Sequence, residues 1–71
     1  MGKFRVKLHD ENNNSWELVS ICHIYPDVHR WVALKDIRAT HFISKEDARK
    51  ALDNFQNNRN NAKYSGTIIE I

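Results

Sequence analysis

The sequence predicts a small two-layer α+β domain of β-β-β-α-β order, with an antiparallel sheet and one helix packed on one of its faces. Polar and apolar side chains alternate over residues 3–9, which is the period of a strand with one solvated face. Residues 44–55 carry a capping residue followed by one apolar stripe, the pattern of an amphipathic helix. Such a helix buries its stripe by packing on a sheet. The chain has 71 residues, enough for one core, so we expect residues 1–71 to form a single domain.

Turn-forming residues divide the strands from one another. Asp10–Ser15, with three consecutive asparagines, breaks the first alternating pattern as a loop, and Pro26-Asp27 marks a turn. Residues 37–42 either continue the third strand or pair separately. The predicted strands span residues 3–9, 16–25, 29–34 and 64–71, the last of them built around Gly66.

The helix begins at Ser44, and Asp47 three residues later completes a capping-box-like pattern. Ile43, just before the cap, is placed to pack onto the first turn of the helix as a hydrophobic staple. The asparagines of residues 57–61 are expected to end the helix. The apolar stripe consists of Ala48, Ala51, Leu52 and Phe55.

The faces of the hairpin between the second and third strands depend on the length of its loop. A three-residue loop at Pro26–Val28 places Tyr25 opposite His29 and buries one face under the helix, namely Trp16, Leu18, Cys22, Ile24, Val32 and Leu34. The opposite face then holds Glu17, Val19, Ile21, His23, Tyr25, His29, Trp31 and Lys35. A four-residue loop moves Trp31 to the first face and sends Val32 and Leu34 to the second, because a one-residue slip inverts every side chain.

Both faces of this hairpin are apolar, whereas one helix covers only one of them. We therefore expect an exposed apolar patch that binds another protein or a second copy of the chain, as in a homodimer. Aromatic side chains supply the contact area at such interfaces, and charged residues form the rim. The alternative is that the sheet curls, or that residues 37–42 fold back over the patch. The expected partner-binding residues are His23, Tyr25, His29 and Trp31, with Arg30 and Lys35 as rim charges.

A second functional hypothesis is the binding of single-stranded nucleic acid. Arg5 and Lys7 lie on the solvated face of the first strand, and Tyr25 and Trp31 share that face of the sheet in one register. Aromatic side chains between basic ones are typical of surfaces that stack bases. The net charge of +2 leaves this hypothesis open without favouring it.

The sequence predicts no enzyme, no metal and no cofactor. Cys22 and His23 are adjacent on a predicted strand and point to opposite faces, so they cannot share one ion. His23 and His29 approach across the hairpin but lack two of the four ligands that zinc prefers, unless His9, His41 or a second subunit supplies them. Cys22 is expected mid-strand among apolar neighbours, where a thiol behaves as a small buried hydrophobic group.

Composition points to a reducing compartment. One cysteine cannot form an internal disulfide, and small secreted domains usually depend on several. No apolar run approaches the length of a membrane span, and residues 1–5 lack the apolar region of a signal peptide. We expect a cytoplasmic protein.

Three stretches carry a resemblance to a known group of proteins: Trp-Glu-Leu-Val at 16–19, Arg-Trp-Val at 30–32, and Phe-Ile-Ser-Lys-Glu-Asp-Ala at 42–48 before a short helix and a terminal strand. In these the chain resembles short uncharacterised proteins of phage and prophage genomes in Gram-positive bacteria. The resemblance implies a small accessory factor in the host cytoplasm that works by binding, such as an inhibitor of a host enzyme or defence system. It implies no particular functional residues.

Overall fold

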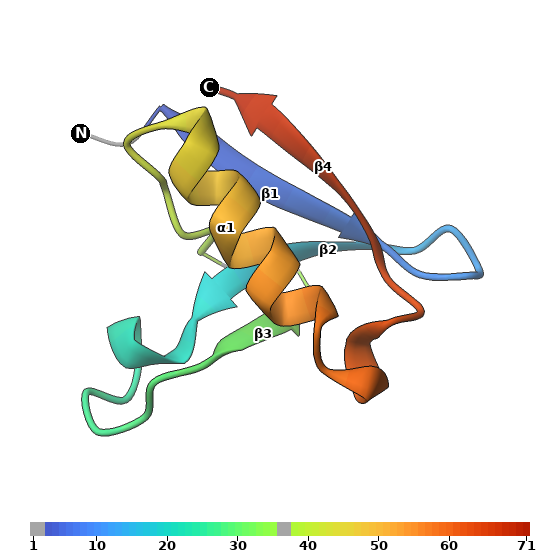
Figure 1. Ribbon diagram of the computed structural model, residues 1–71, viewed down its shortest axis with the longest axis horizontal. Coiled ribbons are helices and arrows are strands. Elements are labelled where there is room, and N and C mark those ends of the chain that lie inside the picture. Colours follow the sequence, from blue (N-terminus) through green and yellow to red (C-terminus); the bar gives the residue numbers. More distant parts are fainter. Residues whose placement is uncertain (1–2, 36–37) are drawn as a thin grey trace.

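A computed structural model, in which residues 3–35 and 38–71 are described, has the predicted α+β class and the predicted β-β-β-α-β order (Figure 1). The four strands form one antiparallel sheet in the order β3-β2-β1-β4, and α1 packs across one face of it. The strands are β1 (Phe4–His9), β2 (Ser15–Ser20), β3 (Trp31–Leu34) and β4 (Ser65–Glu70), and the helix is α1 (Lys45–Gln56). Two short 3-10 turns, η1 (Ile21–His23) and η2 (Arg59–Asn61), complete the described elements.

The strands β1 and β4, at the two ends of the chain, confirm the predicted strand positions to within one residue at each end of both elements. They pair along their whole length, from Phe4 opposite Glu70 to His9 opposite Ser65. The backbone N–H of Ile71 extends the ladder by donating to the carbonyl of Lys3 at 2.7 Å. Alternation puts Val6 and Leu8 on the helix side of β1, where both are fully buried.

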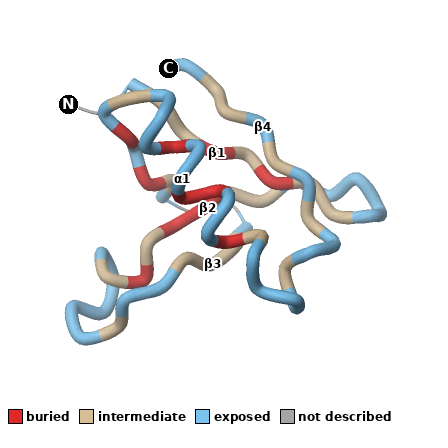
Figure 2. The backbone as a smooth tube through the Cα atoms, viewed as in Figure 1, coloured by how far each residue is buried: buried red, intermediate tan, exposed pale blue. Residues whose placement is uncertain are grey.

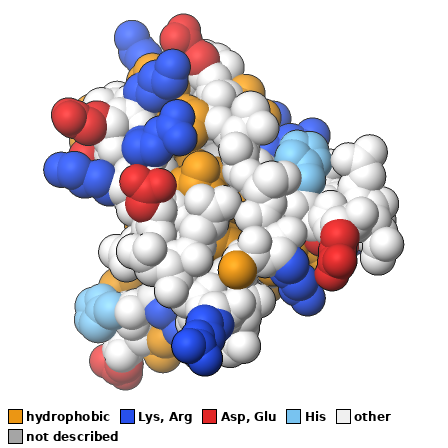
Figure 3. Space-filling view, turned by 45° about the vertical axis from the view of Figure 1, so that its right-hand side comes forward, with side chains coloured by type: hydrophobic (Ala, Val, Ile, Leu, Met, Phe, Trp, Pro, Cys, Tyr) orange, Lys and Arg blue, Asp and Glu red, His pale blue; other side chains and the backbone are white. Residues whose placement is uncertain are grey.

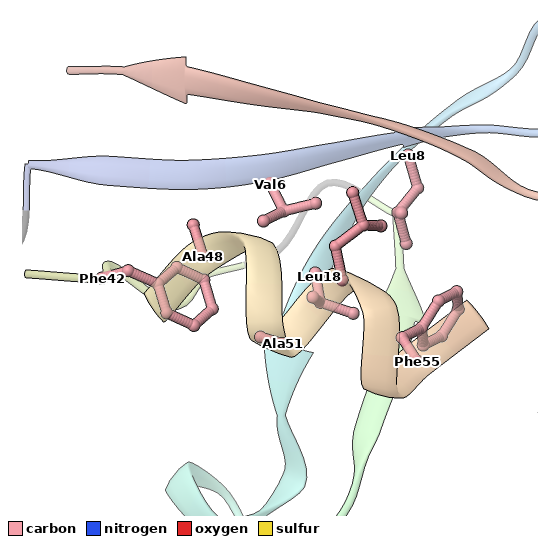
Figure 4. Close-up of a cluster of buried hydrophobic side chains, with 8 residues drawn as sticks. Val6, Leu8, Leu18, Phe42, Ala48, Ala51 and Phe55 are labelled. Atoms are coloured by element: carbon pink, nitrogen blue, oxygen red, sulfur yellow. The ribbon is translucent and has the colours of Figure 1, made fainter. Parts of the chain in front are cut away.

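The core lies between α1 and the two central strands, β1 and β2. Figure 2 shows the buried stretches meeting at the middle of the molecule, and Figure 4 shows side chains from the helix and the sheet pointing toward one another. The predicted helical stripe is confirmed, because each of its four members is at most 5% exposed. The core consists of Val6, Leu8, Leu18, Phe42, Ala48, Ala51, Leu52 and Phe55.

The start of α1 also confirms the predicted cap. Ser44 Oγ accepts a hydrogen bond of 3.1 Å from the backbone N–H of Asp47, which satisfies one of the free donors of the first turn. The expected staple by Ile43 is wrong, since that side chain is 75% exposed. Over residues 3–35 and 38–71, no helix has the length and apolar content needed to cross a membrane.

The strand β2 ends five residues earlier than predicted. After Ser20 the chain turns through η1, where the N–H groups of Ile24 and Tyr25 both donate to the carbonyl of Ile21, at 2.9 and 2.7 Å. Residues 21–30 therefore connect β2 to β3, and the three-residue loop at Pro26–Val28 is wrong. The N–H of Ile21 still donates to the carbonyl of Arg30, but beyond it the N–H groups of Ile24, Tyr25 and Val28 bond locally.

The observed register inverts the expected faces of β3. Leu18 lies opposite Ala33 and Ser20 opposite Trp31, so Trp31 shares the helix side of the sheet with Leu18. Its ring packs on the ring of Phe42 at a centroid distance of 5.3 Å. Val32 and Leu34 point to the other side. This is the distribution of faces expected for the four-residue loop, reached here through a longer connection.

The segment before α1 is inserted between β1 and β2, where the two strands diverge. Phe42 pairs with Phe4 through N–H to carbonyl bonds of 2.7 and 3.1 Å. The N–H of Thr40 donates to the carbonyl of Leu18 at 3.2 Å, and Thr40 Oγ1 accepts from the N–H of Ser20 at 2.8 Å. The second alternative for residues 37–42 is thus confirmed at 40–42, which pair separately from β3, whereas Ile37 lies outside the described residues.

Two apolar side chains of the face expected to be exposed are buried, whereas Tyr25 of the same face is exposed. Val19 points away from α1 yet is only 1% exposed, and Ile21 is 8% exposed. Thr40 lies on the opposite side of β2 from β3. The alternative in which residues 37–42 fold back over the patch involves Ile37, which lies outside the described residues.

Thr40 offers a sharp test of this inserted segment. Replacing Thr40 with Val removes the acceptor of the Ser20 N–H, which leaves a buried donor unpaired, and we expect the free energy of unfolding to fall by about 1–3 kcal/mol. Thr40→Ser keeps the hydroxyl and should lose clearly less. Denaturant unfolding of both variants measures the difference, and equal losses would show that the hydroxyl is not what matters.

The loop between β1 and β2 is organised by one carboxylate. Asp10 accepts from the N–H groups of Asn12 and Asn14, each at 2.9 Å, and from Asn14 Nδ2 at 3.2 Å. Asn13 adopts a left-handed backbone with φ of 65°, which asparagine tolerates better than most residues. The hydrogen bond from the backbone of Asn14 is the main reason that the pKa of Asp10 lies below its ordinary value.

The lowered pKa predicts a pH dependence of stability. A carboxyl whose pKa is lower in the folded state stabilises the fold above its unfolded pKa of about 3.9, and that contribution is lost as the pH falls through the folded value. We therefore expect Asp10→Asn to be less stable than the wild type at pH 7 and to approach it on acidification. Thermal unfolding between pH 7 and 2.5 measures this, and a constant difference would contradict it.

Candidate partner-binding groove

A groove runs between α1 and the β2–β3 connection, and the side chain of Trp31 borders it throughout. It consists of three adjoining cavities of about 600, 370 and 250 Å³, all lined in part by Trp31. We call this feature the Trp31 groove. In Figure 3 charged side chains of both signs gather in the upper left part of the view, whereas hydrophobic atoms show between uncharged groups across the middle.

The largest cavity has a mixed lining, in which apolar side chains lie among polar ones and the charged Asp47 and Lys50. Trp31, Phe42 and Ala51 form its inner wall, and the exposed Ile43 stands at its edge. Residues 40–42 lie between β1 and β2 and lead directly into the cap of α1. This path places Ile43 at the edge of the cavity. The side chain that was expected to staple the helix thus lies at the edge of the groove.

The wall formed by the β2–β3 connection carries Cys22, His29 and Arg30. Cys22 Sγ lies 3.4 Å from His29 Nδ1 and 3.6 Å from the carbonyl of Pro26. The expectation that Cys22 is a buried mid-strand residue is wrong, because η1 replaces the strand and turns the half-buried thiol into the groove. Thiol and imidazole therefore meet at a partly open surface.

Among the residues that the structure describes, no third side chain hydrogen-bonds to this thiol–imidazole pair. In nucleophilic sites a further side chain orients the base, usually a carboxylate or an amide. Among the described residues no carboxylate lies within ion-pair distance of His29. The described residues also contain no group of three or more His, Cys, Asp or Glu placed to hold a metal ion.

The side of the groove that faces the β2–β3 connection is lined by asparagines. From the sequence, asparagines of this region are expected only to form a loop. Asn54 lies on α1, Asn58 follows the helix in extended backbone, and Asn61 lies in η2. Asn58 Oδ1 accepts from the N–H of Asn60 at 3.0 Å, and Asn61 Nδ2 donates to the carbonyl of Phe55 at 3.0 Å. Asn58 and Asn61 lie beyond the end of α1, so no helical spacing in the sequence identifies this side of the groove.

Of the six residues predicted to bind a partner, the structure brings four to the groove. His29, Arg30 and Trp31 line its middle cavity, and His23 lines the largest one. Tyr25, 60% exposed, and Lys35, just after β3, do not border any of the three cavities. The prediction that His23, Tyr25, His29 and Trp31 share one hairpin face is wrong, because β2 ends at Ser20 and the register of β3 is inverted.

The residues of the nucleic-acid hypothesis are divided between different surfaces. Arg5 and Lys7 lie on the sheet face away from α1, whereas Trp31 lies on the helix side and Tyr25 in the connection. Arg5 Nη1 is 3.9 Å from Glu17 Oε1, so a carboxylate neutralises part of the basic strand. The shared face of Arg5, Lys7, Tyr25 and Trp31 is therefore wrong.

Comparison with known proteins adds no assignment to this groove. No protein-family model, no curated protein and no solved structure matches the chain.

Proposed function

We propose that the chain is a small non-catalytic binding protein whose contact surface is the Trp31 groove. The observation that carries the proposal is the position of Trp31, which borders all three cavities and packs on the core through Phe42. A large aromatic side chain held in this way offers contact area without losing much conformational freedom on binding.

The lining of the groove supports recognition of a protein segment. Ligand-binding surfaces are mostly apolar with a few placed polar groups, and here Trp31, Phe42 and Ile43 are flanked by Cys22, His29 and the asparagines. The asparagine amides suit peptide groups, which both donate and accept hydrogen bonds. No observation in the structure favours nucleic acid over this partner.

The biological setting belongs to the same proposal. The chain resembles phage-encoded proteins, and its groove holds a thiol–imidazole pair with no third partner among the described residues. Both features suit a phage-type accessory factor or inhibitor that acts on a host protein in the host cytoplasm. Self-association as a homodimer is the other way in which such a surface becomes covered.

Selection from a library of random linear dodecapeptides displayed on phage tests the groove as a binding surface. We expect the wild-type protein to enrich a set of peptides whose binding falls at least tenfold in Asn54→Arg, where a long side chain occupies the groove. Asn57→Arg is the matched control, because Asn57 is equally exposed but lines none of the three cavities.

Chemical modification of Cys22, the single cysteine of the sequence, obstructs the groove in a second way, independent of Asn54→Arg. A bulky maleimide on Cys22 should abolish binding of the same peptides, whereas Cys22→Ser treated with the reagent should keep it. Circular dichroism checks that the labelled protein stays folded. The proposal fails if no peptide is enriched, or if enriched peptides ignore both blocks. Binding of single-stranded oligonucleotides that is lost at both blocks would assign the groove to nucleic acid instead.

A further inference from the structure

The outer edge of β4 carries unpaired backbone groups. β4 is the last strand on its side of the sheet, next to β1 (Figure 1). The N–H of Ile71 donates to the carbonyl of Lys3, so alternation directs the backbone groups of residues 65, 67, 69 and 71 toward β1. The N–H and carbonyl groups of Gly66, Ile68 and Glu70 therefore point outward, and within residues 3–35 and 38–71 no backbone group pairs with them.

This edge lacks the features that usually protect an exposed strand from pairing. Protected edge strands are short, carry lysine or proline, or are interrupted by a bulge. β4 has six residues, contains neither lysine nor proline, and pairs with β1 in one uninterrupted register. Apart from Glu70, its residues are small or β-branched, and Ile71, which follows it, is 64% exposed. The strand is therefore suited to pairing with a further strand.

The position of the cavities favours a second copy of the chain over a foreign peptide at this edge. Peptides that add to a sheet edge are recognised through pockets for their alternate side chains. No residue of β4 lines any of the three cavities of the Trp31 groove. A second copy of β4 needs no pocket, because a two-fold axis fixes the register and each strand meets the same residues in the other.

Antiparallel pairing about a two-fold axis at Ile68 matches β4 with itself. Ile68 then lies opposite Ile68 of the second copy and Gly66 opposite Glu70, so every such pair joins outward-pointing backbone groups. On the other face Thr67 lies opposite Ile69, and β-branched pairs of this kind stabilise neighbouring strands. Each Glu70 meets a glycine, and the two Glu70 positions are separated by four residues, about 14 Å along the strands.

The charges at the two ends of β4 are complementary in this register. Glu70 is exposed at one end, and Lys63, exposed just before the other, holds its Nζ 5.6 Å from the centre of the Tyr64 ring. Tyr64 packs on Phe55 and so lies on the helix side, as Glu70 does. Glu70 of one copy, opposite Gly66, is thus diagonal to Tyr64 and within reach of Lys63. The two-fold axis forms this ion pair twice.

We infer that two copies of the chain pair through β4, in antiparallel orientation, so that one continuous sheet joins the four strands of each copy. The axis is perpendicular to the sheet, which places both helices on the same side of it. β4 lies at the edge opposite β3, so the Trp31 groove stays open in both copies. The inference goes beyond the proposed function and does not depend on it.

Sedimentation velocity over a range of protein concentrations tests the dimer, and charge reversal tests its register. We expect Lys63→Glu and Glu70→Lys each to weaken association at least tenfold, because each variant alone brings like charges together. An equimolar mixture of the two variants should associate at least tenfold more tightly than either one, since both ion pairs then form across the interface. Lys50→Glu is the matched control, at an exposed lysine that lines the groove, and should dimerise like the wild type.

Amide hydrogen exchange locates the interface. In the dimer, exchange should slow at least tenfold at Gly66, Ile68 and Glu70 relative to the dilute protein, and stay unchanged along β3. The inference is overturned if the protein is monomeric at every concentration, if a dimer ignores both charge reversals, or if Asn54→Arg dissociates it, which places the interface in the groove. Protection of those three amides by a selected peptide in a monomeric protein also overturns it and assigns the edge to a foreign segment.

Discussion

Replacing Leu18 with Ala should remove about half of the stability of this domain. Leu18 is fully buried between β2 and α1 and belongs to the core (Figure 4). Truncating a buried leucine costs about 2–5 kcal/mol, because apolar contact is lost and a cavity remains. A domain of 71 residues has a total free energy of unfolding of roughly 4–10 kcal/mol. Denaturant unfolding should therefore show a folded variant that has lost about half of its stability.

Leu34→Ala is the matched control for this prediction. Leu34 lies in the neighbouring strand, opposite Glu17, but points away from the helix and is only half-buried. Its truncation should cost about 1 kcal/mol, in proportion to the smaller area that it buries. The three-residue loop, one of the two alternatives that the sequence left open, would place Leu18 and Leu34 on one face. Equal losses in the two variants would favour that register and contradict the one observed.

Replacing Gly66 with Ala should cost about 1–3 kcal/mol through overpacking. A Cβ at this position would lie 2.8 Å from Leu52 Cδ2 and closer still to Cδ1. Leu52 is only 3% exposed and is enclosed by the core, so it has little room to move aside. The backbone of Gly66 does not need a positive φ, which leaves the steric contact as the cause.

A double-mutant cycle separates this cause from a general intolerance of β4. In the Leu52→Ala background the space next to Gly66 is open, so Gly66→Ala should cost nothing or stabilise the strand by about 0.5–1 kcal/mol, as alanine does relative to glycine within a strand. The coupling between the two positions is then a change of sign. If Gly66→Ala costs the same in both backgrounds, the contact with Leu52 does not determine the effect.

Local signals predicted the helix and the two terminal strands. The cap at Ser44 and the stripe from Ala48 to Phe55 act over three or four residues, so the sequence contains all that determines them. The same holds for β1, whose alternation places Val6 and Leu8 in the core. In these elements the local pattern agrees with the tertiary packing.

The end of β2 depends on a distant residue, which the sequence does not indicate. Ile21, Cys22 and His23 have no local feature that ends a strand. At Ser20 the N–H is taken by Thr40 Oγ1, twenty positions away, and the chain then turns within η1. The register of β3 follows from this turn. A hairpin with a three-residue loop therefore assigns Trp31, Val32 and Leu34 to the wrong faces of the sheet.

The candidate site was predicted in part for the same reason. His29, Arg30 and Trp31 are neighbours in sequence and were identified together, and they do meet at the groove. Their setting was not predictable, because it requires η1 to turn Cys22 toward His29 and α1 to bring Asn54 and Asn58 opposite Trp31. The residues were recognisable from the sequence, and the surface that they form was not.

The pairing of β1 with β4 bears on how the chain folds. These two strands share the longest ladder of the sheet, yet its partners are separated by about 60 positions in the sequence. β1 and β2, joined by a short loop, pair over only three positions, from Lys7 opposite Glu17 to His9 opposite Ser15. Closing such a long loop costs chain entropy before any contact compensates for it, so domains of this topology fold slowly for their size. During synthesis, β1 must wait for Glu70 to leave the ribosome, and until then its outer edge is open to other chains.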